Sequence, residues 1–184
     1  MTKIINLYGG PGTGKSTSAA YLFYKLKQAG FSVELVREYV KNWAWEKRHI
    51  SIYDQYYFMG KQIRHESLLF GKVDFIVTDC PVNLSRYYAE KYSPPKIRDG
   101  VVAAVEGYYA QCAQDGYEHI HVFMERSKPY NPEGRFQTQG EALVMDAEIR
   151  LMLHRALNGA WTYQCATDDQ SLDSLFKSIT TNKE

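Results

Sequence analysis

A dense group of glycine, lysine and hydroxyl residues lies near the start of the chain. Residues 9–17 read GGPGTGKST, so Gly9 to Ser16 fit the pattern G-x-x-x-x-G-K-[ST]. Glycines let the backbone wrap tightly with its amides pointing at phosphate oxygens, and a helix that begins at the loop adds the positive end of its dipole. Lys15 is expected to reach the β- and γ-phosphates, and Ser16 to coordinate magnesium. The motif predicts a site for ATP and Mg²⁺ formed by Gly10, Gly12, Thr13, Gly14, Lys15, Ser16 and Thr17.

Two carboxylates follow predicted strands further along the chain, in the segments VREYV and VTDCP. Ligands of parallel α/β sheets lie at the carboxyl ends of the strands, so Glu38 is expected beside the phosphate loop, where it can accept or orient the proton of an acceptor hydroxyl. Asp79 is expected to hold the magnesium shell together with Ser16. The alternatives are structural: Glu38 as a solvated partner of Arg37, and Asp79 as a turn residue before Pro81.

A polar stretch with two prolines is expected to form a lid at about residues 126–140. Arginines in such a lid neutralise the charge on a transferred phosphoryl group, and the closed lid excludes water. Arg126 lies at the root of this stretch and Arg135 near its tip. An exposed polar loop without a catalytic role is the alternative. The residues predicted to be catalytic are Glu38, Lys15, Arg126 and Arg135.

Aromatic and basic residues alternate between positions 39 and 65. Aromatic faces stack nucleobases, and nearby cations bind phosphates or a nucleic-acid backbone. The residues predicted to bind the acceptor are Tyr39, Trp43, Tyr56, Gln62 and Arg64. The stretch holds more rings than a small metabolite needs, which favours a nucleotide within DNA that is reached by base flipping or threading. The alternative is that several rings belong to the core and that KRH at 47–49 is a solvated loop.

Hydrophobic periodicity places these residues on alternating strands and helices. Strands are expected at 4–8, 31–36, 73–78, 119–124 and 161–166, and helices at 15–28, 52–70, 83–92, 98–114, 141–157 and 171–179. The predicted fold is α/β: a P-loop NTPase kinase-like three-layer α/β/α sandwich with a five-stranded parallel sheet and an arginine-bearing lid, in one domain over residues 1–184. In this topology the turn after the fifth strand approaches the adenine, so Thr167 is added to the predicted nucleotide site; a helix-capping turn is the alternative.

The composition excludes several classes of protein. The net charge is +1 over 184 residues, so no overall field attracts nucleic acid or an anionic membrane, although a local basic face is compatible with it. No apolar run approaches the roughly 20 residues that span a bilayer, and the first residues lack a signal-peptide pattern. The three cysteines are widely spaced and odd in number, which predicts reduced thiols in a cytoplasmic protein without a membrane partner.

Four segments together resemble a known group of enzymes: GGPGTGKST, REY after the second strand, TDCP after the third, and PYNPEGRFQ before a helix. Over roughly residues 4–179 the chain is similar to small P-loop kinases of the nicotinamide-riboside-kinase-like ATPase/kinase family. Phage-encoded members of that family include kinases of 5-hydroxymethyluracil in DNA, which act in the host cytoplasm. The resemblance implies that Glu38 is the base, Asp79 the acid after strand three and Arg135 the lid arginine. Deoxynucleoside kinases usually carry a proline and an arginine where this chain has Tyr39 and Cys80, which argues against a plain deoxynucleoside kinase.

Three functions are compatible with these residues. The first is an ATP-dependent kinase of a nucleotide hydroxyl, with 5-hydroxymethyluracil in DNA as the favoured acceptor. The second is a metabolite kinase that acts on a free nucleoside such as nicotinamide riboside. The third is a P-loop ATPase switch that transfers no phosphate, against which the lid arginines and Glu38 argue. A GTPase is disfavoured because the sequence has no N-K-x-D motif.

Overall fold

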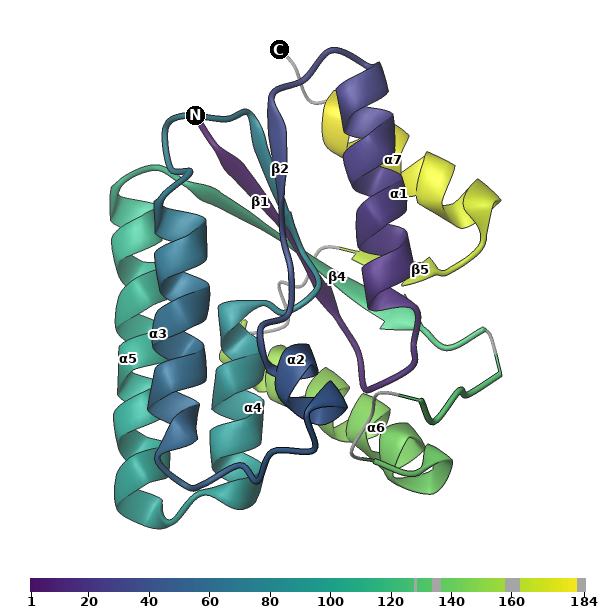
Figure 1. Cartoon of the computed structure of the whole chain (residues 1–184). Helices are drawn as coiled ribbons and strands as arrows, with labels where there is room; N and C mark the ends of the chain where they lie inside the picture. Colours follow the sequence, from purple (N-terminus) through teal and green to yellow (C-terminus); the bar gives the residue numbers. More distant parts are fainter. Residues whose placement is uncertain (128, 134–136, 158–162, 182–184) are drawn as a thin grey trace.

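The computed structural model describes residues 1–127, 129–133, 137–157 and 163–181. Within these residues, strands and helices alternate along most of the chain (Figure 1). The strands are β1 (Lys3–Tyr8), β2 (Val33–Val36), β3 (Phe75–Thr78), β4 (Glu118–Glu125) and β5 (Tyr163–Ala166). The helices are α1 (Lys15–Gln28), α2 (Val40–Trp45), α3 (Asp54–Ser67), α4 (Val82–Tyr92), α5 (Pro95–Gln114), α6 (Gln139–Ala156) and α7 (Asp169–Thr181).

The strands form one parallel sheet in the order β2-β3-β1-β4-β5. The central strand β1 is buried along nearly its whole length, as expected for a parallel strand covered on both faces. Its side chains alternate: Ile5 and Leu7 pack with α1 and α7, whereas Ile4 and Tyr8 pack on the opposite face. The predicted three-layer α/β/α fold with a five-stranded parallel sheet is therefore confirmed.

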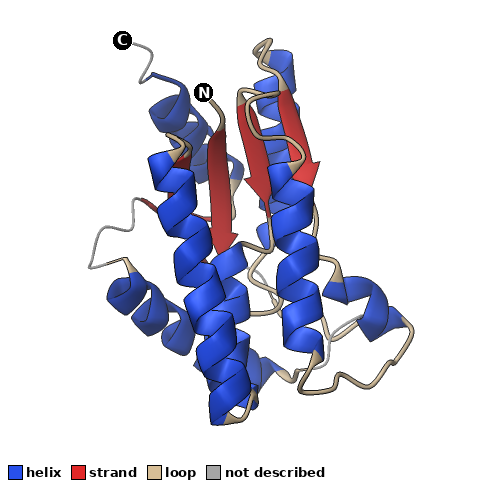
Figure 2. Cartoon of the chain, turned by 90° about the vertical axis from the view of Figure 1, so that its left-hand side faces the viewer, coloured by secondary structure: helices blue, strands red, loops and turns tan. Residues whose placement is uncertain are grey.

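Each face of the sheet has its own hydrophobic core. On one face, α1 and α7 cover the strands and contact each other. On the other face lie α3, α4 and α5. Helix α6 contacts α4 on this side. Figure 2 shows the long helices α3 and α5 in front of the sheet. Fully buried side chains of α6 include Met145, Ile149 and Leu153, which pack against Tyr8 and Phe123 at the end of the sheet.

The carboxyl ends of the strands share one edge of the sheet. The loop between β1 and α1 lies at this edge, and α2, α4 and α6 gather around it (Figure 1). In parallel α/β sheets this edge is where ligands bind. The fold therefore brings together the segments that follow β1, β2, β3 and β4, although they are far apart in the sequence.

The structure differs from the predicted elements in one helix and in several boundaries. The short helix α2 was not predicted; none of its six residues is buried and no side chain caps its start, so it carries little of the pattern that marks a helix in sequence. Helix α5 begins three residues before the predicted position, because Pro95 occupies the first turn, where its missing N–H costs nothing. Helix α3 is shorter than expected and is followed by Gly71, which has a φ of +69°.

Candidate active site

The loop between β1 and α1 is built around glycines in conformations that other residues avoid. Gly9, Gly12 and Gly14 have φ values of +142°, +76° and +98°. A Cβ at Gly12 would lie 2.9 Å from Cδ2 of Tyr130, and a Cβ at Gly14 would lie 2.8 Å from Cγ2 of Thr167. Both the backbone angles and the available space therefore require glycine. A loop of this shape, at the start of α1, fits a phosphate chain.

The side chain of Lys15 folds back over this loop. Its Nζ donates to the carbonyl oxygens of Gly9 at 2.7 Å and Gly10 at 3.0 Å. Thr13 Oγ1 donates to the same Gly10 carbonyl at 3.0 Å and is almost fully buried. The ammonium group is thus held at the mouth of the loop, where it can neutralise the charge of a terminal phosphate.

A cavity of about 600 Å³ opens next to the loop. Its walls come from the phosphate loop, α2 and the segment after it, one face of α3, one face of α4, and the start of α6. Five of the residues predicted to bind nucleotide line it: Gly12, Gly14, Lys15, Ser16 and Thr17. Gly10, Thr13 and Thr167 do not line it. Gly10 and Thr13 make hydrogen bonds within the protein, and Thr167 packs beside Gly14. Ser16, predicted to coordinate magnesium, faces the cavity.

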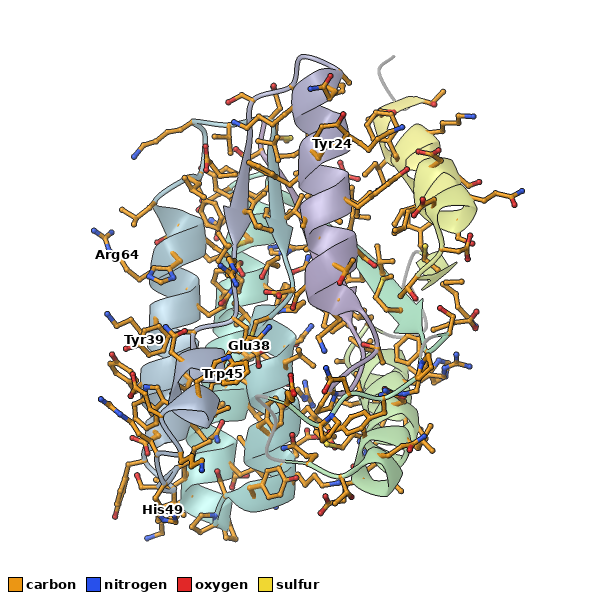
Figure 3. All side chains as sticks on the ribbon, turned by 45° about the vertical axis from the view of Figure 1, so that its right-hand side comes forward. Tyr24, Glu38, Tyr39, Trp45, His49 and Arg64 are labelled. Carbon is orange, nitrogen blue, oxygen red and sulfur yellow. The ribbon has the colours of Figure 1, made fainter. Side chains whose placement is uncertain are left out.

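The predicted base and the predicted second magnesium ligand are tied together. The half-buried Glu38 lines the cavity with Lys15 and Ser16, and Figure 3 shows it between α2, α4 and the start of α1. Asp79 is 3% exposed, and its Oδ1 accepts a hydrogen bond from the Glu38 backbone N–H at 2.9 Å. This hydrogen bond joins the ends of β2 and β3 and fixes the backbone position of Glu38. Asp79 itself is not among the residues that line the cavity.

Arg126, the predicted root of the lid, forms a buried clamp that the sequence did not predict. Its Nε donates to Asp146 Oδ2 at 2.9 Å, and its Nη2 donates to the Pro11 carbonyl at 2.8 Å. The other oxygen of Asp146 accepts from the Gly10 backbone N–H at 2.6 Å. Asp146 stands in the middle of α6 and matched no motif; only the structure shows that it connects this helix, the phosphate loop and Arg126.

The described part of the predicted lid lies over the phosphate loop. The ring of Tyr130 is 5.9 Å from the Arg126 guanidinium, and its hydroxyl donates to the Gln137 carbonyl. Ser127 Oγ and Thr167 Oγ1 are 2.5 Å apart, which ties the root of the lid to the turn after β5. Helix α6 then begins with a capping box between Thr138 and Glu141. The predicted lid arginine Arg135 lies outside the described residues.

The five residues predicted to bind the acceptor fall into two groups. Tyr39 and Gln62 line the cavity. Trp43, Tyr56 and Arg64 do not. Trp43 packs edge-on against Phe58 at 4.9 Å, and Tyr56 lies so close to Gly100 of α5 that a Cβ there would collide with it. Arg64 is exposed on α3 and points away from the cavity in Figure 3.

Several cavity residues were not among the predicted acceptor contacts. On α3, Gln55 and Phe58 lie on the same helical face as Gln62. On α4, Tyr88 and Tyr92 are four residues apart, and this spacing is the signal that marks them as one face. Cys80, directly after Asp79, completes this wall.

Two titratable groups of the cavity wall, Cys80 and Tyr88, stay uncharged. Burial raises the pKa of the Cys80 thiol well above its ordinary value, and the negative charges of Glu38 and Asp79 raise it further. Burial likewise raises the pKa of the Tyr88 hydroxyl, again with a contribution from Glu38. Both groups are therefore protonated at neutral pH, and Cys80 is no thiolate nucleophile.

Three features are absent from the described residues: a cluster of metal-ligating side chains, a membrane-spanning helix and a disulfide. No group of three or more His, Cys, Asp or Glu side chains is arranged to hold a metal ion there. None of the helices in these parts of the chain is both long and apolar enough to cross a bilayer. The three cysteines form no disulfide.

Comparison with known proteins places the chain among P-loop folds. Residues 4–168 match a family model described as AAA domain. No curated protein matches the sequence. The solved structure of the NadR protein in complex with NAD and AMP-PNP has a TM-score of 0.69 at 15% identity, over 98% of this chain and 49% of that chain. NadR in complex with NR gives the same score and identity, over 98% and 50%. A deoxyadenosine kinase from M. mycoides, with dCMP and dCDP bound, has a TM-score of 0.57 at 10% identity over 97% of both chains.

The chain spans about half the length of the NadR chains that it matches. At these identities the likenesses show a shared fold. The P-loop kinase-like architecture predicted from the sequence agrees with them.

Proposed function

We propose that this chain, which belongs to the AAA domain family, is an ATP-dependent phosphotransferase that moves the γ-phosphoryl group to a hydroxyl of a nucleotide-type acceptor. One observation carries the proposal: Lys15, Ser16 and Glu38 line the same cavity, and aromatic and amide side chains form part of its other walls. A nucleotide switch needs the phosphate loop, but it does not need a carboxylate that faces room for a second substrate. A kinase needs both.

The roles of the chain's own residues follow from their positions. The amides of the loop and the Lys15 ammonium bind the triphosphate, and Glu38 orients the acceptor hydroxyl or takes its proton. Arg126 keeps one buried nitrogen, Nη1, without a hydrogen-bond partner among the described residues, and this atom lies 3.2 Å from the position of a Cβ at Gly12. It is a spare donor for phosphate oxygens. Arg135 is proposed to add a second positive charge from the lid.

Magnesium is proposed to accompany the nucleotide. Ser16 offers a hydroxyl in the cavity, and Asp79 a carboxylate at the adjacent strand end, which are the oxygen ligands that Mg²⁺ prefers. When bound, the ion would neutralise charge on the phosphates.

The favoured acceptor is 5-hydroxymethyluracil within DNA, because the rim of the cavity is both aromatic and basic. The Arg48 guanidinium lies 5.2 Å from the Trp43 ring, and Lys61 Nζ lies 5.6 Å from the rings of both Tyr39 and Tyr57. Arg48 and Tyr39 also line the cavity, so this surface continues into it. Stacking rings beside cations suit the nucleotides that flank a flipped base.

The second candidate acceptor is a free nucleoside. A cavity of about 600 Å³ has the volume of a small-molecule site. The solved relatives with the same fold include NadR in complex with NR. Nicotinamide riboside is therefore the natural small-molecule comparison.

The test is incubation with γ-labelled ATP and four acceptors: DNA containing 5-hydroxymethyluracil, the same DNA without it, free 5-hydroxymethyl-2′-deoxyuridine, and nicotinamide riboside. The proposal predicts label on the hydroxymethylated DNA, and no label with the Lys15→Ala protein. Label on a free nucleoside alone would support the second candidate. ATP turnover with no labelled acceptor of either kind would reject a phosphotransferase function on these acceptors.

A further inference from the structure

A buried carboxyl group lies behind the acceptor chamber. Glu66 of α3 has no exposed surface. Its Oε2 accepts a hydrogen bond from the Tyr108 hydroxyl of α5 at 2.5 Å, and its Oε1 accepts from Gln62 Nε2 at 2.7 Å. Burial raises the pKa of Glu66 to about 7, and the two hydrogen bonds act against that increase. A buried acid without a charged partner is costly, so a local reason for its presence is expected.

Glu66 and Thr78 fix the side-chain amide of Gln62. Nε2 has two protons; one goes to Glu66 and the other to Thr78 Oγ1 at 3.0 Å. The Thr78 hydroxyl also accepts from the Cys80 backbone N–H at 3.1 Å, so it is itself held in place. If the amide were turned over, its carbonyl oxygen would face Glu66 Oε1, which is an acceptor while the carboxyl group is ionised or carries its proton on Oε2. The hydrogen bonds thus assign the orientation of the amide.

The carbonyl oxygen of Gln62 remains for the cavity. Gln62 is 3% exposed, and yet it lines the chamber. Its partners Glu66 and Thr78 are fully buried and lie on the far side of it from the chamber. Within the described residues no donor is bonded to Gln62 Oε1. A nearly buried carbonyl that faces a cavity is completed by a donor on the molecule that fills the cavity.

We propose that Gln62 Oε1 selects acceptors that present an N–H group to it, and that Glu66 is a positioning residue that keeps the amide in this orientation. The proposal rests on the function proposed above. It deepens that function by specifying the acceptor. Both amide protons of Gln62 are donated to Glu66 and Thr78, so only its carbonyl oxygen can contact the acceptor, and the acceptor must donate the hydrogen bond. An imide N–H, as in a uracil-type base, fits this site, whereas an N-methylated imide does not.

The experiment compares two probes on the wild-type protein: 5-hydroxymethyl-2′-deoxyuridine and its 3-N-methyl derivative. Binding is measured by calorimetry with a non-hydrolysable ATP analogue present, and the side-chain amide resonance of Gln62 is followed by NMR. We expect the methylated probe to bind at least tenfold more weakly, and only the unmethylated probe to shift the Gln62 resonance. Equal binding, or binding of neither probe, would overturn the proposal.

Three variants test the positioning role. In Glu66→Met the amide is free to turn, so the preference for the unmethylated probe should fall to within about twofold. In Glu66→Gln the new carbonyl can still accept from Gln62, so the preference should survive. Gln62→Leu should abolish it. If Glu66→Met and Glu66→Gln behave alike, Glu66 contributes only packing.

This experiment separates the two proposals, because it requires no transfer of phosphate. Discrimination between the probes, together with no labelled acceptor in the γ-labelled ATP experiment above, would leave the N–H selection standing and reject the kinase function. Phosphorylation of both probes at similar rates, measured with ATP, would support the kinase function and reject the N–H selection.

Discussion

The guanidinium of Arg126 and the carboxylate of Asp146 form a salt bridge of 2.9 Å, with only 12% and 17% of the two side chains exposed. Through it the root of the predicted lid is attached to the middle of α6. Since Asp146 also accepts from the Gly10 backbone N–H, this ion pair is part of the support of the phosphate loop. The phosphate loop is thus coupled to α6.

The first prediction removes the charge of this support. Asp146→Asn puts an amide N–H against donors of Arg126 or Gly10, so it should lower the free energy of unfolding by about 2 kcal/mol. ATP affinity should fall about tenfold because the loop loses a fixed anchor. Urea denaturation and calorimetric ATP titration measure the two effects. The control is Asp99→Asn, whose carboxylate pairs with the exposed Arg98 and should change neither value beyond error.

A second prediction concerns the candidate base. Glu38→Gln keeps the size of the side chain and the backbone N–H that Asp79 holds, but it cannot take a proton. The turnover number should fall by roughly 10²–10⁴-fold, with the dissociation constant of ATP unchanged. Glu34→Gln, an exposed position on β2 paired with Lys27, is the matched control and should retain full turnover. Transfer within a few-fold of wild type in the Glu38 variant would remove this residue from the chemistry.

The third prediction uses two glycines of the chain. Gly14→Ala introduces a Cβ at a φ of +98°, 2.8 Å from Thr167 Cγ2, and should cost about 1–3 kcal/mol of stability together with most of the ATP affinity. Gly140→Ala in the first turn of α6 meets no atom within 4 Å and should be neutral or slightly stabilising. Thermal unfolding with and without ATP compares them. A Gly14→Ala protein that binds ATP like wild type would show that the loop does not hold the phosphates.

A fourth prediction is the pH dependence of stability. Burial lowers the pKa of His119 to about 3 and that of His121 to about 4. Their contribution to stability is therefore present above pH 6.5, the unfolded value, and is lost as the pH falls, at up to about 1.4 kcal/mol per pH unit for each histidine. Glu66 acts in the opposite direction: its pKa is raised from 4.5 to about 7, so its contribution is present below pH 4.5 and is lost as the pH rises to 7.

Between pH 6.5 and 4.5 the stability lost through the two histidines exceeds the stability gained through Glu66. The free energy of unfolding should fall toward low pH by up to about 1.4 kcal/mol per unit in the wild type, and by about twice that slope in Glu66→Gln. Urea denaturation at pH intervals of 0.5 gives both slopes. Parallel curves for the two proteins would mean that Glu66 does not titrate in this range.

The sequence was sufficient for the architecture and for the phosphate loop. Periodicity located all five strands and six of the seven helices within the described residues, because each of those helices buries a continuous face. The loop was recognisable since its glycines are required by backbone geometry, which leaves a fixed spacing in sequence. Helix α2 escaped because it is short and buries no side chain.

The lining of the cavity was harder to predict from the sequence. Aromatic composition alone does not tell a ring that lines a cavity, as Tyr39 does, from one that packs beside it, as Trp43 does. The roles of Asp146 and Glu66 depend on contacts with residues more than 40 positions away, such as Gly10 and Tyr108. Such pairings leave no local pattern.

Apart from the phosphate loop and the two positions 137 and 141, every residue that lines the cavity comes from one uninterrupted stretch, residues 38–93. Most of the cavity lining is therefore contiguous in sequence, although it surrounds the phosphate loop in space. Recombination at both ends of that stretch would replace most of the cavity lining together with Glu38 and Asp79, while Lys15, Ser16 and Arg126 would stay in place.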